Sequence, residues 1–378
     1  MTEKRVYFQS LNGLRFFAAT AVIFHHVEQY KFWAGLPNIW GNTIIDALGH
    51  KAVSLFFVLS GFLITYLLLV EKQKTGTIQI KNFYLRRILR IWPLYFLIVT
   101  ICLFILPYAF DLSTLHIDRT KNFALTAVLL FLVLPNVVRL INRQLVGGNQ
   151  LWSIGVEEQF YIIWPVAVRM FIKRLPEFLI SFILIKLLIT IGLQIAVAHS
   201  PSLLLSKIYQ FWVLLKIEQM TIGALGAWAL FHQKQNILSF IYSKPVWIIS
   251  ILAALALMVV HYNHWSINYI EAFIFLSLIM NLSTNKDFPI TLEYSWLGSL
   301  GNMAYGIYMY HTICITICLF TLRGLSLDKI NFTLFNVALY ASSILLTIGI
   351  AYLSYNFFEK PFLNLKEKFM LVKSGKKD

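Results

Sequence analysis

The sequence has few charged residues and is especially poor in acids. Asp, Glu, Lys and Arg together make up only 13% of its 378 residues, whereas 58% are hydrophobic. So little charge leaves little room for a separate soluble module. Lys and Arg number 32 and Asp and Glu only 17. No basic soluble domain exists to carry this excess, so we expect no nucleic-acid partner. The excess fits the cytoplasmic side of a membrane protein.

Cysteine is also scarce. The three cysteines, Cys102, Cys314 and Cys318, all lie in apolar runs. Cys314 and Cys318 are one helical turn apart, but no His or acid completes a set of metal ligands beside them. We therefore expect three packing residues, no metal site and no permanently bound cofactor. Residues 1–9 are polar and show no features of a signal peptide.

Long apolar runs are abundant, and most are long enough to span a bilayer. They cover 10–30, 51–70, 91–110, 151–170, 177–198, 208–231, 245–263, 266–283, 299–321 and 332–356. They predict an all-α polytopic integral membrane protein with about ten transmembrane helices. We see no internal repeat or low-complexity segment, so a single domain covers 1–378.

One further run, 122–138, is short and is interrupted by Pro135-Asn136. If this run is re-entrant or interfacial and the N-terminus is inside, the inside segments hold 20 Lys and Arg, against 9 outside. If the run spans instead, every later loop changes side, including the basic tail at about 363–378. The positive-inside rule therefore predicts that both termini are cytoplasmic, in the cell's inner membrane.

The first apolar run carries one arginine and two histidines. Arg15 and His26 are eleven positions apart, which is three helical turns plus about 20°, so they share a helix face. They lie roughly 16 Å apart along the axis, and His25 points about 80° away. Ionisable residues in a membrane helix cost several kcal/mol unless they face a protein interior or a water-filled cavity. This helix should therefore line a polar site.

The run 151–170 contains a second polar face. Ser153, Glu157 and Tyr161 are spaced by four and form one stripe, whereas Glu158 faces about 100° away. Buried polar groups need partners, so such a stripe on an apolar helix is more often the wall of a site than an accident.

Near the C-terminus, Tyr308 and His311 are three residues apart and share a face. A single histidine in an aromatic helix is more often structural than catalytic. The presence of a third membrane histidine beside the first two raises the odds of a functional role only modestly.

The segment 81–93 carries three arginines, Arg86, Arg87 and Arg90. The residues alone support two interpretations of these arginines equally well. They could form a basic belt on anionic lipid headgroups. They could equally be a cytoplasmic phosphate clamp, since guanidinium groups match phosphate oxygens. A clamp would suit a nucleotide-like donor such as a coenzyme A thioester.

Several other polar residues interrupt the apolar runs. Ser60-Gly61 permits close helix packing, and nothing in those residues demands more. Lys216 and Glu218 lie near the middle of the run 208–231, and Lys186 and Glu271 lie inside other runs. We expect structural ion pairs among them, without knowing which.

Six separated motifs then agree with one family. They are GLRFFAATAVIFHH, FFVLSGFLIT, FYLRRILRIWP, WSIGVEEQFYIIWP, AYGIYMYH and FEKPF, in this order between residues 11 and 362. As a set, they resemble the acyltransferase 3 family of integral-membrane O-acyltransferases, which acylate cell-surface glycans and some small molecules. Many members carry an extra extracytoplasmic esterase-like domain, and this chain resembles the stand-alone type.

The resemblance implies site residues at matching positions. The family's spacing of ten intervening residues selects His26 as the partner of Arg15, with His25 as the alternative because the histidine is doubled. The other matching positions are Arg87 and Arg90, Ser153 and Glu157, and Tyr308 and His311.

The implied reaction moves an acyl group, most simply acetyl, from cytoplasmic acyl-CoA to a hydroxyl of an extracytoplasmic or lipid-linked glycan. His26 would be the general base or acyl carrier, with Arg15 or Tyr308 stabilising the oxyanion. Arg15 could equally hold a CoA phosphate, because it lies nearer the cytoplasmic side. Of the remaining residues, Glu157 and His311 are assigned to catalysis, Arg86, Arg87 and Arg90 to the CoA, and Ser153 and Tyr161 to the substrate.

A proton-coupled transporter or flippase is the rival interpretation, because such proteins also bury ionisable residues in membrane helices. The sequence shows no inverted repeat, which speaks against this rival. A transporter would also need no acyl-CoA and would leave its substrate covalently unchanged.

Overall fold

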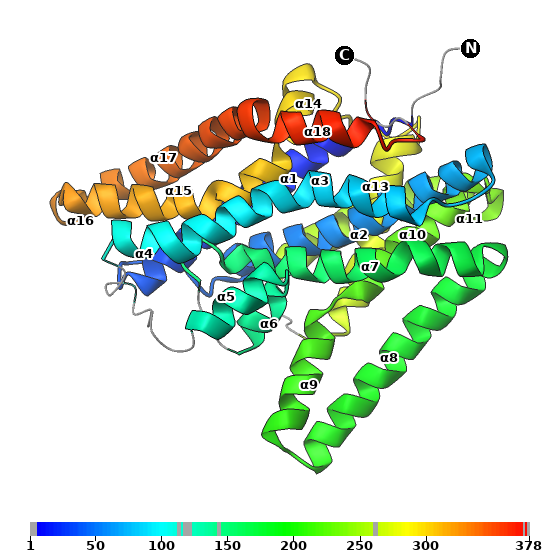
Figure 1. Cartoon of the computed structure of the whole chain (residues 1–378), viewed down its shortest axis with the longest axis horizontal. Helices are drawn as coiled ribbons and strands as arrows, with labels where there is room; N and C mark the ends of the chain where they lie inside the picture. The colour runs from blue at the N-terminus through cyan, green and yellow to red at the C-terminus, as the bar shows by residue number, and fades with distance from the viewer. Residues whose placement is uncertain are drawn as a thin grey trace.

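A computed structural model describes residues 6–111, 115, 123–141, 145–259, 264–372 and 375. The regular elements in these ranges are helices, and most of the long ones run along the longest axis of the molecule (Figure 1). The long helices are α1 (Leu11–Trp33), α2 (Thr43–Thr75), α3 (Ile80–Thr100), α7 (Trp152–Phe171), α8 (Leu175–His199), α10 (Ile217–Phe231), α12 (Lys244–Val259), α13 (Ile267–Thr284), α15 (Ala304–Gly324) and α17 (Phe332–Leu353). The shorter ones are α4 (Leu106–Ala109), α5 (Phe123–Phe131), α6 (Pro135–Leu140), α9 (Leu203–Leu214), α11 (Gln235–Tyr242), α14 (Ser295–Asn302), α16 (Leu327–Ile330) and α18 (Lys360–Glu367).

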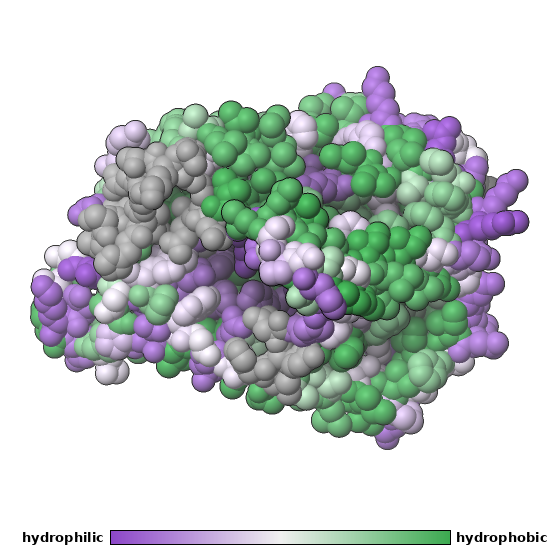
Figure 2. Space-filling model, turned by 90° about the horizontal axis from the view of Figure 1, so that it is seen from below, coloured by the Kyte–Doolittle hydropathy of each residue, from purple (hydrophilic) through white to green (hydrophobic). Residues whose placement is uncertain are grey.

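The fold is that of a polytopic membrane protein, as the apolar runs predict. Within the described ranges, seven helical stretches are long and apolar enough to cross a membrane, or eight if the bent pair α11 and α12 forms one span. The predicted number of about ten is therefore approximate. One stretch, Asn149–His199, contains two of the predicted spans, α7 and α8, between which the chain turns back (Figure 1). Figure 2 shows hydrophobic residues over much of the upper and right-hand part of this face, as contact with lipid requires, and hydrophilic residues at its two ends and around the central hollow.

Two segments refine the predicted topology. The described part of 122–138 forms the short helices α5 and the start of α6, and neither is among the candidate spans, in agreement with the re-entrant or interfacial prediction. The predicted span 208–231 is broken into α9 and α10. Lys216 has a positive φ of 39° and caps α10 at this break. The prediction that Lys216 lies near the middle of a helix is therefore wrong.

Helix α2 lies at the centre of the bundle and packs closely against α10. A Cβ atom added to Gly61 would lie 1.9 Å from the carbonyl oxygen of Met220. A Cβ on Gly223 would lie 2.1 Å from the carbonyl oxygen of Val58. Only glycine allows the two backbones to come this close, which confirms the packing interpretation of Ser60-Gly61.

Both ends of the described chain lie on one side of the molecule (Figure 1). The backbone N–H of Gly375 donates to the carbonyl of Val6 at 3.1 Å. Helix α1 starts close to this side and has 23 residues, so it extends roughly 34 Å away from it. Trp33 and the loop 34–42 therefore lie near the opposite end. The predicted basic tail falls only partly within the described residues.

Candidate functional site

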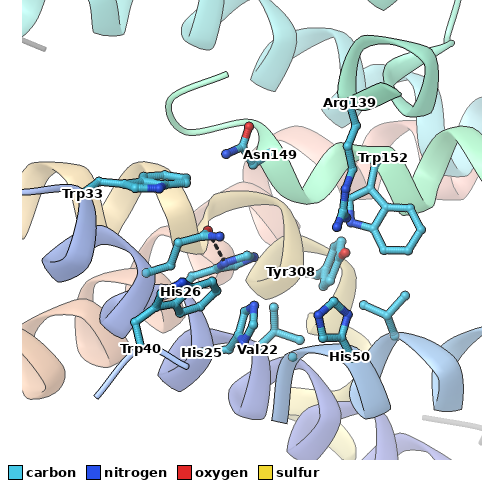
Figure 3. A pocket seen from close by; sticks show the side chains of 13 residues that line it. Val22, His25, His26, Trp33, Trp40, His50, Arg139, Asn149, Trp152 and Tyr308 are labelled. Carbon is cyan, nitrogen blue, oxygen red and sulfur yellow. Dashed lines mark hydrogen bonds between the residues drawn. The ribbon is translucent and has the colours of Figure 1, made fainter. Parts of the chain in front are cut away.

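A cavity of about 400 Å³ lies where the C-terminal half of α1 meets the N-terminal ends of α2 and α7 and the beginning of α15 (Figure 3). Its lining consists of Val22, His25, His26, Gln29, Trp33, Trp40, Gly49, His50, Val53, Arg139, Asn149, Trp152 and Tyr308. None of these thirteen residues is an acid. The predicted polar site on the first helix is therefore a cavity with three histidines, three tryptophans and an arginine in its wall.

His26, a buried lining residue of α1, packs against a second histidine ring from α15. Its ring stacks on that of His311, with the centroids 5.0 Å apart and the planes at 12°. The His26 Nδ1 lies 3.1 Å from Oε1 of Gln29, as the dashed line in Figure 3 marks. When Nδ1 donates to this oxygen, the lone pair of a neutral His26 is on Nε2.

His311 is fully buried, and its Nδ1 lies 2.7 Å from the carbonyl oxygen of Tyr308. A carbonyl only accepts, so Nδ1 carries the proton and Nε2 holds the lone pair. Within the described part of the chain, this Nε2 has no hydrogen-bond partner. A buried polar atom without a partner is costly and is a common mark of a functional site.

His25 also lines the cavity, although it points away from the shared face of Arg15 and His26. Its Nδ1 donates to the carbonyl of Ile45 at 2.9 Å, and its ring contacts those of His26, Trp40 and His50. Gly49 makes room for it, since a Cβ there would lie 2.4 Å from the His25 ring. His25 is therefore held firmly by its surroundings, whereas His26 is bonded only through a side chain.

Tyr308 and Ser153 connect the cavity to the polar stripe of α7. Their hydroxyls are 2.8 Å apart, and both lie within 3.2 Å of the carbonyl oxygen of Gln150. The Gln150 amide in turn donates to the carbonyls of Gly147 and Met309. This network fixes the Tyr308 hydroxyl at the cavity wall.

The rest of the α7 stripe faces a second polar cluster. Tyr161 donates to Glu157 at 2.7 Å, and its hydroxyl is also 2.5 Å from that of Ser60. Arg15 lies near Arg87 and Arg90 as well as Glu157 and Tyr161. Tertiary folding thus brings five predicted site residues from three helices close together. Ser153, on the same α7 stripe, bonds to Tyr308 at the cavity.

The arginines of α3 have different surroundings. Arg86 is paired with Glu71 at 2.8 Å and donates to the carbonyl of Phe369 at 2.9 Å. Arg87 lies over the rings of Phe83 and Tyr161, and its Nε is buried with no partner among the described residues. Arg90 is exposed. Arg86 is therefore fixed by structural contacts, whereas Arg87 and Arg90 keep unused hydrogen-bonding capacity.

The predicted residues thus fall into two groups. His26, His25 and Tyr308 line the cavity, His311 stacks against it, and Ser153 bonds to Tyr308. Arg15 does not line this cavity. It shares a helix face with His26, but three helical turns of α1 separate them, so the two belong to opposite ends of the polar region.

Sequence reasoning missed several lining residues, chiefly Arg139, Asn149, Trp152 and His50. Arg139 and Asn149 lie between apolar runs, where no helical period relates them to the histidines. His50 directly precedes a span and belongs to no recognised motif. The one available signal was that Trp and His residues occur at the ends of apolar segments, which is common in membrane proteins.

In the described ranges, no three His, Cys, Asp or Glu side chains are arranged to hold a metal.

Comparison with known proteins gives a consistent result. The model of the acyltransferase 3 family, described as an acyltransferase domain, matches residues 8–355. O-acetyltransferase OatA of Staphylococcus aureus is 28% identical over 372 residues, covering 94% of this chain and 57% of the relative. Peptidoglycan O-acetyltransferase OatA of Listeria monocytogenes is 31% identical over 202 residues, covering 51% of this chain and 29% of the relative.

A putative O-acetyltransferase of Staphylococcus aureus is 27% identical over 396 residues, which cover 95% of this chain and 58% of that protein. The chain thus spans somewhat more than half the length of the Staphylococcus relatives. No solved structure matches it.

Proposed function

Because the chain belongs to the acyltransferase 3 family, we propose that it is a membrane O-acyltransferase that moves an acyl group, most simply acetyl, from acyl-CoA to a hydroxyl of a cell-envelope glycan. The names of the relatives, O-acetyltransferase and peptidoglycan O-acetyltransferase, support both the acetyl group and a cell-wall glycan acceptor. The observation that carries the proposal is the stack of the His311 ring on that of His26, a residue of the cavity wall.

In this proposal the termini and the arginine cluster face the cytoplasm, and the protein lies in the cytoplasmic membrane. The charge distribution supports this orientation, with 20 Lys and Arg on the terminal side against 9 on the other. Acyl-CoA would approach from the cytoplasm and the glycan from the opposite side, where Trp33 and Trp40 lie.

Arg15, Arg87 and Arg90 would hold the phosphates of the donor. A guanidinium group can donate two parallel hydrogen bonds to a phosphate, and the Nε of Arg87, which has no partner among the described residues, supplies a free donor. Arg86 would support this site from behind, since its pair with Glu71 and its bond to Phe369 fix the start of α3. The thin pantetheine arm would run along Glu157, Tyr161 and Ser153 toward the cavity.

His26 would act as the general base. Its Nε2 takes the proton of the acceptor hydroxyl, and the hydroxyl oxygen attacks the thioester carbonyl. The carbonyl oxygen becomes negative and is stabilised by the Tyr308 hydroxyl, which Ser153 and Gln150 hold in place. The C–S bond then breaks, and the CoA sulfur leaves with the proton returned by His26.

The stacking of His311 on His26 is compatible with the uptake and return of a proton by His26. A neutral ring packed against His26 accommodates the charge that His26 gains for a moment, without adding a second charge of its own. In a second route, His26 carries the acyl group covalently before the hydroxyl attacks. His25 is the alternative base, although its bond to Ile45 and its packing leave it less free to move.

The test uses purified protein in nanodiscs with radiolabelled acetyl-CoA and no acceptor. We expect slow thioester hydrolysis by the wild-type chain and a loss of about 10²–10⁴-fold in His26→Ala. His199→Ala is the matched control, because His199 is exposed at the end of α8 and should leave hydrolysis unchanged.

Label retained on the wild-type protein and absent from His26→Ala would identify the covalent route. A stably folded His26→Ala protein with full activity would refute the assignment of His26, and loss of activity in His25→Ala would then move the role to His25. A folded wild-type protein that neither binds nor hydrolyses acetyl-CoA would refute the acyl-CoA donor.

A further inference from the structure

Among the described residues that line the cavity, Arg139 alone carries a permanent charge, and the proposed acyl-transfer steps do not use it. It comes from α6, a short helix between the membrane spans. Its guanidinium carbon lies 4.5 Å from the centroid of the Trp152 ring, and Figure 3 shows the two side chains next to each other above Tyr308. Stacking on an aromatic face holds a guanidinium in place while leaving its N–H edge free.

Within the described ranges, no acid neutralises this guanidinium. Arg139 forms no ion pair or hydrogen bond with any residue that the structure describes, and the cavity lining contains no Asp or Glu. Two acids on the helices that line the cavity have other partners. Asp46 contacts His50 at 3.3 Å, and Glu28 accepts bonds from Lys31, Tyr340 and the backbone of Ile39.

The remaining polar groups of the lining are suited to a sugar. Asn149 and Gln29 offer amide groups for hydroxyls, and Trp33 and Trp40 offer flat apolar faces against which a sugar ring can pack. Arg139 is exposed at the edge of the cavity, whereas His26 and His311 are buried. A ligand entering from this end therefore meets the arginine before it reaches the histidines.

We propose that Arg139, stacked on Trp152, is an anion-binding subsite and that the acceptor is a glycan whose acylated sugar carries a carboxylate. This inference rests on the proposed function and narrows its acceptor class. The carboxylate would accept two N–H groups of the guanidinium, which orients the sugar and directs one of its hydroxyls toward His26. A neutral sugar would leave the guanidinium without a partner in the filled cavity, at a cost in affinity.

The experiment compares two probes that differ only in this group, methyl β-glucoside and methyl β-glucuronide. Their binding to the purified chain in nanodiscs is measured by calorimetry without acyl-CoA. We expect the wild-type chain to bind the glucuronide about 10-fold more tightly or better, the range for hydrogen bonds to a charged group. In Arg139→Gln this preference should disappear. In Arg139→Lys it should be reduced, because lysine keeps the charge but loses the stacked, planar geometry.

Arg169→Gln is the matched control, since Arg169 lies exposed at the far end of α7 and should not alter the preference. A wild-type chain that binds both probes equally, or an Arg139→Gln chain that keeps the preference, would overturn the proposal. Because no acyl-CoA is present, these results are independent of the donor chemistry.

A carboxylate could also belong to the donor, as in succinyl-CoA. Hydrolysis of acetyl-CoA and succinyl-CoA by the same proteins separates the two sources. If Arg139→Gln selectively impairs succinyl-CoA and the glucuronide shows no preference, the anion belongs to the donor and the proposal is wrong. Equal effects on the two thioesters, together with the glucuronide preference, support an acidic acceptor.

Discussion

The two sides of α2 differ in how their ionisable residues are paired. His50 and Lys51 are neighbours in the sequence, yet His50 lines the cavity whereas Lys51 is buried and paired with Glu271 of α13. On the α10 and α13 side, Lys186 of α8 also lies 3.9 Å from Glu218 of α10. Acids and bases are thus matched there. On the cavity side the described lining contains no acid, and Arg139 has no ion-pair partner among the described residues, although His50 contacts Asp46 outside the lining.

This difference teaches that a buried ionisable residue in a membrane helix does not by itself mark a site. A paired charge is explained by its partner and by packing, at a net energy close to that of an apolar residue. An unpaired base beside a cavity is explained only by something that enters the cavity. The prediction of structural ion pairs among Lys186, Lys216, Glu218 and Glu271 is confirmed for Lys186 with Glu218, whereas Glu271 pairs with Lys51, which the prediction did not include.

The largest effect on the paired side is expected from Lys51→Met. It leaves the carboxylate of Glu271 buried without its partner, which should lower the free energy of unfolding by about 3–5 kcal/mol. Thermal unfolding in detergent measures this. The double variant Lys51→Met with Glu271→Gln should recover most of the stability. If Lys51→Met is as stable as the wild type but no longer hydrolyses acetyl-CoA, Lys51 belongs to the functional site, and the two sides of α2 do not differ as described.

A smaller effect is expected where α2 and α10 touch. Gly61→Ala places a methyl group 1.9 Å from the Met220 carbonyl, so the helices must separate, and we expect a loss of about 1–3 kcal/mol. Gly192→Ala on α8 is the control, because a Cβ there meets nothing within 4 Å. The melting temperature of the two variants makes the comparison. If Gly61→Ala has the same melting temperature as the wild type, the close contact between α2 and α10 does not contribute to stability.

The smallest effect on stability concerns the cavity wall. Tyr308→Phe removes the hydroxyl that is proposed to stabilise the oxyanion and that bonds to Ser153 and Gln150, and hydrolysis of acetyl-CoA should fall by about 10²–10³-fold. Stability should change little. Tyr310→Phe is the control, because its hydroxyl bonds to Ser354 instead of a cavity residue. Equal losses in the two variants would show that Tyr308 acts only through packing.

Sequence periodicity explains the success of the α7 prediction. Ser153, Glu157 and Tyr161 all face inward and bond to Tyr308 or Ser60, because a spacing of four keeps residues on one helix face whatever surrounds it. The same reasoning could not place Arg139. Its position depends on how α6 packs against α7, and on Trp152 offering a ring at that point.

The sequence by itself determined the helical membrane fold, the family and the faces that carry polar residues, because apolar run length and helical period are local properties. Only the tertiary structure decided which polar faces meet. It stacked His26 on His311, separated Arg15 from the cavity, and paired Lys51 with Glu271 across 220 positions of chain. Such contacts depend on the order and tilt of helices that lie far apart in sequence, and no local pattern encodes them.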